Sequence, residues 1–461
     1  MLEVIVLAAG EGRRMNSAYP KVLQPIGGRA MLLRLLSSVQ RLDPDRIHVV
    51  VGAGAEHLER ELAGSGCHLV TQTERLGTGH ATAQVLPHVG AESRLLILPG
   101  DMPLVRPSTL ASLLELDADL SIVSFMADDP TGYGRILRGD DGRVNTIREE
   151  KDATDEERTV REVNSGVLAA RADHLSAWLE QIDRDNAQGE YYLTDCIAMA
   201  AAEGRSVQAS IAEAAEELLG ANDRSQLAQL EQVFQRRARR ALLEAGATLA
   251  APETVQLRGE VEVGRDVFID ANVTLIGQVT LGDGVTIGAG CVVEGARLAA
   301  GTCLKPYCVV EGAVTEGPCT LGPFARIRPG TRLAAGVKIG NFVETKNARF
   351  SSGAKASHLS YIGDAEVGAE ANIGAGTITC NYDGANKHRT EIGPGAFIGS
   401  NSALVAPVRI GERAVVGAGS VITAEAPDNA LTLARARQRT IPGWSRPAKP
   451  SKSWGKDPGE E

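Results

Sequence analysis

Residues 263–293, VGRDVFIDANVTLIGQVTLGDGVTIGAGCVV, carry an aliphatic side chain at every sixth position. Alternation of period two places these residues, and the small apolar residues two positions before them, on one face of an extended segment. A fixed six-residue period of this kind predicts a parallel β-helix, in which each coil buries its apolar face against the next. The repeated residues are Val263, Ile269, Leu275, Leu281, Ile287 and Val293, preceded by Val267, Val273, Val279, Val285 and Cys291.

The six-residue grid continues toward the C-terminus with two interruptions. It resumes from Leu321 to Ile339 and again from Ile392 to Ile422. Two segments between Ile339 and Ile392 interrupt it: NFVETKNARFSSGAKASHLSYIG (residues 341–363) and CNYDGANKHRT (residues 380–390). Insertions in a solenoid project as loops and are a usual place for function. We therefore expect two functional loops on the β-helix.

Composition limits the classes of function. The 461 residues allow two or three domains. The net charge of -10 disfavours binding to nucleic acid or to an anionic membrane, so a phosphate-bearing ligand must be held by local basic groups and backbone amides. The N-terminus MLEVIVLAAGEG lacks a basic leader, and no apolar run reaches transmembrane length. These features predict a soluble cytoplasmic protein without a membrane or nucleic-acid partner.

The chain divides by pattern into four segments. Residues 1–224 alternate short apolar strands, among them Val4–Leu7 and Leu95–Leu98, with helical stretches, which predicts an α/β domain. Residues 225–246 form a linker helix that Asn222 or Asp223 can cap and Gly246 can end. Residues 247–427 are the repeat domain. Residues 428–461 are a basic, Pro-rich tail that we expect to be partly disordered.

Two features of the α/β domain suggest phosphate chemistry. The strand at Val4–Leu7 runs into LAAGEGRRM, a Gly-containing loop whose backbone N–H groups can cradle phosphate, with Arg14 and Lys21 nearby; a plain turn is the other interpretation. In LILPGDMPL, Asp101 follows an apolar strand, where ligands of open α/β sheets bind and where a carboxylate can hold Mg²⁺. Asp101 can equally be a turn former before Met102-Pro103.

A wider set of motifs resembles a known family. GTGHA (77–81), DDPTGYGRI (128–136), VNSG (163–166) and NAQGEYYLTD (186–195) are similar to the sugar-nucleotidyltransferase domain of the bifunctional N-acetylglucosamine-1-phosphate uridyltransferase/glucosamine-1-phosphate N-acetyltransferases. KASHLSYIGDAEVG and NIGAGTITCNYDG resemble the acetyltransferase signature of the same family. The resemblance covers residues 4–447 and implies a Rossmann-like nucleotidyltransferase domain followed by a left-handed parallel β-helix.

The resemblance implies uridylyl transfer from UTP to N-acetylglucosamine-1-phosphate, with release of pyrophosphate and formation of UDP-N-acetylglucosamine for peptidoglycan and lipopolysaccharide. Arg14 and Lys21 would hold the phosphates, and Asp101 with Asn222 would bind Mg²⁺. The remaining implied contacts are to the nucleotide from Leu7, Ala8, Ala9, Gly10, Gln72, Gly77 and Thr78, and to the sugar from Gly134, Glu149 and Asn164.

For the β-helix, the resemblance implies acetylation of glucosamine-1-phosphate by acetyl-CoA. A lone His such as His358 is more often structural, but by this resemblance it is the general base that deprotonates the amine, a task suited to imidazole. Arg435 can offer charge to a coenzyme A phosphate, or it can be a solvated residue of the tail. The other implied residues are Arg328, Lys346, Tyr361 and Asn372 for the sugar phosphate, and Ala375, Asn381, Tyr382, Ser400 and Ala418 for acetyl-CoA. A homotrimer is also implied.

Three departures from the family pattern and two rival interpretations accompany this assignment. Arg13, Pro99 and Ser357 stand where the family commonly has other residues, and they affect local contacts rather than any role named above. One rival is a single-activity sugar-1-phosphate nucleotidyltransferase with a structural β-helix. The other is a non-catalytic scaffold built from the same two folds. The constellation of Lys21, Asp101 and His358 favours the bifunctional enzyme over both rivals.

Overall fold

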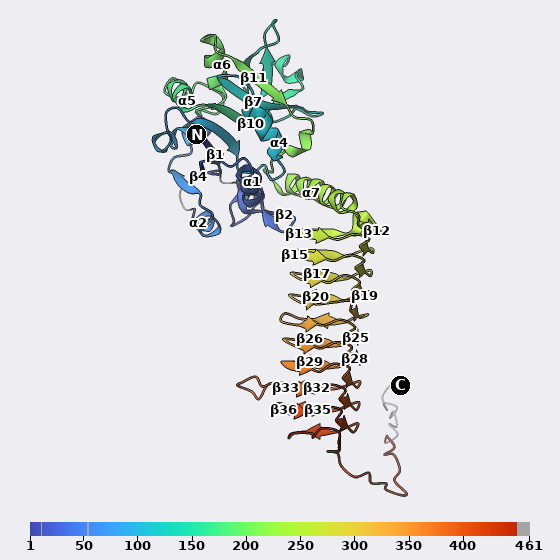
Figure 1. Ribbon diagram of the computed structural model, residues 1–461. Coiled ribbons are helices and arrows are strands. Elements are labelled where there is room, and N and C mark those ends of the chain that lie inside the picture. The colour runs from blue at the N-terminus through green and yellow to red at the C-terminus, as the bar shows by residue number, and fades with distance from the viewer. Residues whose placement is uncertain (11, 53–54, 450–461) are drawn as a thin grey trace, which may run out of the picture. The chain divides into compact units, whose positions relative to one another are not determined.

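A computed structural model describes residues 1–10, 12–52 and 55–449 (Figure 1). The chain forms two compact units, residues 1–329 and residues 330–461, which are considered separately below. The end of the tail that we expect to be disordered, residues 450–461, lies outside the described residues.

The first unit begins with a mainly parallel sheet that is buried on both faces. β1 pairs in parallel with β4 and β6, and β10 runs antiparallel between β6 and β7. The strands expected from short apolar runs are therefore confirmed. In spatial order the main strands are β11 (Val207–Ile211), β7 (Leu120–Met126), β10 (Glu162–Arg171), β6 (Arg94–Pro99), β1 (Leu2–Leu7), β4 (Arg46–Gly52) and β5 (His68–Gln72), with β8 (Arg135–Arg138) and β9 (Val144–Arg148) beside β10.

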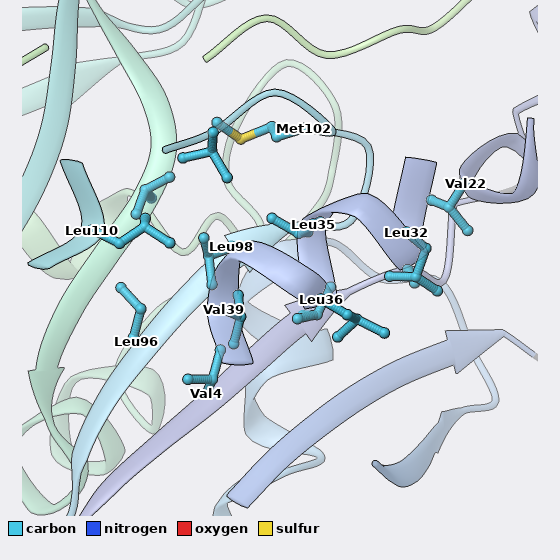
Figure 2. Close-up of a cluster of buried hydrophobic side chains, with 14 of the residues drawn as sticks. Val4, Val22, Leu32, Leu35, Leu36, Val39, Leu96, Leu98, Met102 and Leu110 are labelled. Atoms are coloured by element: carbon cyan, nitrogen blue, oxygen red, sulfur yellow. The ribbon is translucent and has the colours of Figure 1, made fainter. Parts of the chain in front are cut away.

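Alternate residues of the central strand enter two different cores. Val4 and Val6 pack with Leu35 and Val39 of α1, as Figure 2 shows around Val4, Val39, Leu96 and Leu98. Ile5 faces the opposite cluster, which includes Trp178 of α5. Helices on both faces explain why the strands are continuous apolar runs rather than alternating ones. The helices around the sheet are α1 (Met31–Gln40), α2 (Glu56–Glu61), α3 (Thr78–Ala83), α4 (Pro107–Leu114), α5 (Ala172–Leu179) and α6 (Asp195–Ala202).

The strand order reverses at β1, and this reversal positions the site. β1 lies between β4 and β6, and its last residue, Leu7, is in register with Pro99. The loops that leave the carboxyl ends of these two strands therefore diverge and open a crevice, as expected at a topological switch point.

The predicted linker helix is present as α7 (Arg224–Glu244). Of the two candidate caps, Asp223 is the one used: its side chain accepts a hydrogen bond from the Gln226 N–H at 2.9 Å. Gly246, with φ of 97°, follows the helix in a left-handed conformation that glycine adopts without a steric penalty.

The first unit ends in regular coils of a parallel β-helix. Phe268 pairs with Thr286, 18 positions later, and Thr286 pairs with Cys303, 17 positions later. The first of these coils contains three hexads and the second is one residue shorter, and the parallel stacking of the coils confirms the β-helix expected from the grid. The strands are β12 (Thr248–Leu249), β14 (Phe268–Ile269), β16 (Thr286–Ile287), β19 (Cys303–Leu304) and β22 (Thr320–Leu321); β13 (Gln256–Val263), β15 (Thr274–Leu281), β17 (Val292–Glu294), β20 (Val309–Glu311) and β23 (Arg326–Ile327); and β18 (Arg297–Leu298) with β21 (Val314–Thr315).

The second unit consists of further coils, again in three stacks of parallel strands. The first stack pairs Lys338 with Lys355 and then Lys355 with Asn372. The strands are β25 (Lys338–Asn341), β28 (Lys355–His358), β31 (Asn372–Ile373), β34 (Phe397–Ile398), β37 (Val415–Val416) and β39 (Leu431–Thr432); β26 (Glu344–Lys346), β29 (Tyr361–Gly363), β32 (Ile378–Cys380), β35 (Ala403–Val405) and β38 (Val421–Ile422); and β24 (Arg332–Leu333), β27 (Arg349–Phe350), β30 (Ala365–Val367), β33 (Thr390–Ile392) and β36 (Val408–Ile410).

The expectation that residues 341–363 form a projecting loop is wrong. Glu344 pairs with Tyr361 and Arg349 with Glu366, so this stretch is an ordinary coil. The coil contains 17 residues, one fewer than three hexads, and the apolar grid therefore loses phase although the coil remains closed. The buried residues that fill its interior include Val343, Ala348, Phe350, Ala354, Ala356 and Ile362.

The second interruption is a true insertion. Asn372 pairs with Phe397, 25 positions later, whereas Phe397 pairs with Val415 after the usual 18. The additional residues lie between β32 and β33 and close on themselves through an isolated bridge between Tyr382 and Lys387. Within the described part of the chain, no helix is both long and apolar enough to cross a membrane.

Candidate active sites

A cavity of about 510 Å³ opens at the crevice between β1 and β6. It gathers residues that are far apart in the sequence, from the loop after β1, the end of β5, the start of α3 and the end of β6. Most of the nucleotide and sugar residues expected from the sequence line it: Leu7, Ala8, Ala9, Gly10, Lys21, Gln72, Gly77, Thr78, Asp101, Glu149 and Asn164.

Gly12 allows the loop after β1 to pass directly over Lys21. Its φ is 64°, and a Cβ atom placed on it would lie 2.5 Å from the Cβ of Lys21. Lys21 itself begins a short 3-10 turn, Lys21–Leu23, that directs its side chain into the cavity. Gly12 therefore packs directly against the lysine.

Replacing Gly12 with Ala is expected to reduce nucleotidyl transfer by about 10²-fold, because a displacement of about 1 Å at a reacting centre has that effect. The new methyl group must push the loop or Lys21 aside, which steady-state kinetics with UTP will detect. Gly64→Ala is the matched control, since Gly64 has φ of 78° and nothing within 4 Å of a built Cβ. Equal losses in both variants would show that backbone strain, not displacement of Lys21, is responsible.

Two oxygen atoms converge on the ammonium of Lys21. Its Nζ donates to Asp101 Oδ2 at 2.6 Å and to Asn222 Oδ1 at 2.9 Å. A carboxylate with an amide oxygen is a donor set that fits Mg²⁺, which prefers one or two protein oxygens together with phosphate and water. Among the described residues, no group of three or more His, Cys, Asp or Glu side chains could hold a metal ion by itself.

The part of the cavity lined by Glu149 and Asn164 contains a carboxyl group in a desolvated position. Thr194 Oγ1 donates to Glu149 Oε1 at 3.0 Å, and the Asn164 N–H donates to the Gly134 carbonyl at 2.8 Å. Burial raises the pKa of Glu149 above its ordinary value; the Thr194 hydrogen bond opposes this, while the charges of Asp195 and Asp152 add to it. Glu149 is thus held where loss of its proton is disfavoured.

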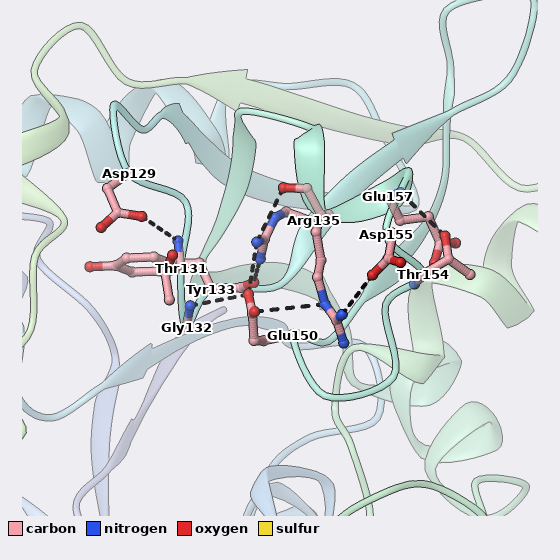
Figure 3. Close-up of polar contacts among 10 residues, drawn as sticks. Asp129, Thr131, Gly132, Tyr133, Arg135, Glu150, Thr154, Asp155 and Glu157 are labelled. Atoms are coloured by element: carbon pink, nitrogen blue, oxygen red, sulfur yellow. Dashed lines mark hydrogen bonds and ion pairs between the residues drawn. The ribbon is translucent and has the colours of Figure 1, made fainter.

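An ion pair behind the cavity holds the two segments that carry Gly134 and Glu149. Arg135, 2% exposed, lies 2.7 Å from Glu150, which also accepts from the Gly132 N–H at 3.1 Å (Figure 3). The hydrogen bond from Arg135 lowers the pKa of Glu150. These contacts therefore join the segment before β8 to the segment after β9, next to the wall of the cavity that Glu149 lines.

We expect Glu149→Gln to stabilise the protein near neutral pH. Because the folded-state pKa of Glu149 is raised, the free energy of unfolding falls as pH rises from the ordinary pKa of a glutamate through the raised folded-state pKa, and the loss persists at higher pH. The side-chain amide of the Glu149→Gln variant does not titrate, so the variant does not lose this stability as pH rises. Unfolding midpoints measured against pH will test this, with exposed Glu156→Gln as the control. Parallel pH curves for wild type and Glu149→Gln would contradict it.

The structure adds lining residues to which the sequence analysis gave no site role, and it leaves Arg14 outside the cavity. Arg75, Pro99 and Thr194 line it, and Arg75 Nε donates to the Ala9 carbonyl at 2.9 Å. Arg75 stands three residues after Gln72, which ends β5. Its positive charge next to a candidate nucleotide residue was the only feature of the sequence that could have indicated it. Arg14 is exposed on the short turn Arg13–Met15 and is not a lining residue, so its phosphate role stays a prediction.

In the second unit, His358 is positioned by a neighbouring coil. It ends β28, is exposed, and its Nδ1 lies 2.7 Å from Asn341 Oδ1 on β25. An amide oxygen only accepts, so Nδ1 carries the proton and Nε2 is left with its lone pair toward solvent. Asn341 was not identified from the sequence; its register opposite His358 becomes visible only once the coils are stacked.

The candidate acetyl-CoA residues lie on successive coils at the corner that follows His358. Leu359 O accepts from the Gly376 N–H at 3.1 Å, Ala375 O from Asn401 at 2.7 Å, and Ser400 O from Gly419 at 2.8 Å. Ala375, Ser400 and their neighbours therefore stack in successive coils next to the residue that follows His358. Arg435 Nη1 continues this stack by donating to the Ala418 carbonyl at 2.8 Å.

The inserted loop is tied to the same unit by polar contacts. Asn381 Nδ2 donates to Asp364 Oδ2 at 2.5 Å and lies 3.5 Å from Tyr361 Oη. Tyr382 is exposed at the loop's start. Lys346 ends β26 and Asn372 begins β31, both in the second unit. Arg328 belongs to the first unit, so its expected role in binding the sugar phosphate together with Lys346 stays a prediction.

Comparisons with known proteins cover both halves of the chain. Residues 4–249 match the MobA-like NTP transferase domain, and residues 260–295 and 389–424 match the bacterial transferase hexapeptide (six repeats). The chain is 52% identical to "Bifunctional protein GlmU" of Alkalilimnicola ehrlichii, over 99% of each chain. It is also 52% identical to the proteins of that name from Stenotrophomonas maltophilia, over 98% of this chain and 99% of the relative, and from Stutzerimonas stutzeri, over 97% and 99%.

Proposed function

This chain belongs to the family of bifunctional GlmU proteins, and from that membership we propose which of its two sites catalyses which reaction. The enzyme acetylates glucosamine-1-phosphate with acetyl-CoA and transfers UMP from UTP to N-acetylglucosamine-1-phosphate, giving UDP-N-acetylglucosamine and pyrophosphate. The observation that carries this conclusion is the match over nearly the full length of relatives that have both halves. A structural β-helix without activity is not favoured.

We assign uridylyl transfer to the cavity at the β1–β6 crevice. A sugar-phosphate oxygen attacks the α-phosphorus of UTP in line, a P–O bond forms, and the bond to the pyrophosphate oxygen breaks. Lys21 and Arg14 would neutralise the phosphates, and Gln72, Gly77 and Thr78 would contact uracil. Asp101 and Asn222 would hold Mg²⁺, which supplies charge neutralisation when bound. Catalysis then rests on positioning and electrostatics, without a covalent intermediate.

We assign acetyl transfer to the corner at His358. The amine of glucosamine-1-phosphate attacks the thioester carbonyl, an N–C bond forms, the C–S bond breaks, and coenzyme A leaves. Nε2 of His358 accepts the amine proton, while the Nδ1–H contact with Asn341 holds the ring in the tautomer that this step requires. Lys346, Tyr361 and Asn372 would bind the sugar phosphate, and the corner from Ala375 to Arg435 would hold acetyl-CoA.

We further propose that the protein is a cytoplasmic homotrimer. Repeat coils with exposed faces are suited to self-association, and its substrates UTP and acetyl-CoA are cytoplasmic metabolites. Sedimentation of the full chain will test the trimer.

The decisive assay combines glucosamine-1-phosphate, acetyl-CoA, UTP and Mg²⁺ with the full chain. We expect UDP-N-acetylglucosamine as the nucleotide-sugar product. Accumulation of UDP-glucosamine alone would support a single-activity nucleotidyltransferase instead, and no turnover of either kind would contradict the proposal.

A further inference from the structure

We propose that His80 is a positioning residue that orients the Gln72 amide and thereby makes the nucleotide site select UTP over CTP. This inference rests on the proposed uridylyl transfer and extends it to a residue that does not line the cavity itself. It is carried by the hydrogen bonds around one buried side-chain amide.

The amide of Gln72 has only one orientation compatible with its neighbours. Its nitrogen, Nε2, lies 3.2 Å from the Gly77 carbonyl and 3.0 Å from His80 Nδ1. A backbone carbonyl can only accept a hydrogen bond, so the atom that faces it must be the NH₂ group. It follows that Nδ1 of His80 is an acceptor and that His80 carries its proton on Nε2. The Nε2 atom lies 3.2 Å from Gln84 Nε2, an NH₂ group that donates to the His80 carbonyl at 3.3 Å, so these two nitrogens do not form a hydrogen bond with each other.

The ring of His80 is held in place by its surroundings. It belongs to α3 and stacks on Tyr191, with ring centroids 6.3 Å apart and an interplanar angle of 29°. The Tyr191 backbone is fixed in turn, because its N–H donates to Leu76 O at 2.8 Å and its carbonyl accepts from Gly79 at 2.9 Å. His80 therefore presents its acceptor nitrogen to Gln72 from a rigid element.

The consequence for the ligand is a fixed acceptor in the cavity wall. Gln72 is 3% exposed and lines the cavity, and both of its N–H groups are used by Gly77 and His80. Oε1 is then the polar atom that remains for a ligand. Uracil offers an N–H at N3 and satisfies it, whereas cytosine has a lone pair at N3 and would leave two acceptors facing each other. A site that pairs polar groups in this way rejects the mismatched ligand strongly.

The test compares UTP and CTP in the full-length protein, both as substrates and as ligands in equilibrium binding. His80→Phe keeps an aromatic ring against Tyr191 but removes the acceptor, and His80→Asn returns an oxygen near the position of Nδ1. We expect His80→Phe to raise KM for UTP about 10-fold with a smaller change in kcat, and to lower the UTP-to-CTP preference about 10-fold. His80→Asn should recover most of the preference, and Gln84→Ala should retain it.

An unchanged UTP-to-CTP preference in His80→Phe would overturn the inference. Equal losses in His80→Phe and His80→Asn would also overturn it, because they would indicate a purely structural role. Acetyl transfer by each variant shows that the second unit is folded. If the wild-type protein binds UTP without transferring UMP, the proposed function fails while binding still tests the role of His80.

Discussion

Replacing His358 with alanine should reduce acetyl transfer by about 10²–10⁴-fold, the usual range for loss of a general base, and leave uridylyl transfer within about two-fold of wild type. Only the free amine of the sugar can attack the thioester, so the reaction needs an acceptor for its proton. His358 is exposed, and the 2.7 Å contact between its Nδ1 and Asn341 fixes the tautomer. Without imidazole, only water remains to take the proton.

A second variant separates catalysis from structure at this position. His358→Gln can still form a hydrogen bond with Asn341, but an amide does not accept a proton near neutral pH. Thiol release from acetyl-CoA measures the first activity, and pyrophosphate release measures the second in the same preparation. Full acetyl transfer by His358→Gln would mean that the residue is structural and that another group is the base.

Replacing Asp101 with alanine should have the reciprocal effect, lowering uridylyl transfer by at least about 10²-fold, as expected for loss of one preorganised electrostatic group. Asp101 Oδ2 and Asn222 Oδ1 converge on one point with Lys21 Nζ, at 2.6 and 2.9 Å. Removal of the carboxylate leaves a single protein oxygen for a divalent ion and releases the lysine from its partner. Acetyl transfer should be unaffected.

Titration with Mg²⁺ gives this prediction a direct control. Asp101→Asn retains the shape and one oxygen, so it should need more Mg²⁺ for half-maximal activity than wild type but less than Asp101→Ala. A chelator should stop uridylyl transfer and not acetyl transfer. If all three proteins respond identically to Mg²⁺, Asp101 does not hold the ion.

Local patterns predicted the regular elements well. The six-residue grid anticipated the coils because each hexad makes one side of a coil, and Asn222–Gly246 anticipated α7 with its Asp223 cap. The grid failed at residues 341–363, where a coil of 17 residues shifts the apolar positions out of phase without opening the wall. A fixed period detects the repeat but not a coil one residue shorter.

The candidate sites were predicted as residue types and not as contacts. Motifs identified Lys21, Asp101, Asn222 and His358, yet no local pattern indicated Asn341 beside His358 or Thr194 beside Glu149. Each missing partner comes from a different strand or coil. Such neighbours share no spacing in the sequence, since their proximity depends on how many residues lie between paired strands.

By itself, the sequence determined that this protein is an α/β domain followed by a β-helix, because burial of alternating or hexad-spaced apolar residues is a property of neighbours along the chain. Only the tertiary structure decided which side chains meet. The pairing of β1 with β6 brings Lys21 to Asp101, the segment before α7 adds Asn222 at the same point, and the stacking of coils brings His358 to Asn341. The physical reason is that chemistry depends on distances of about 3 Å, which are set by the pairing of strands distant in sequence.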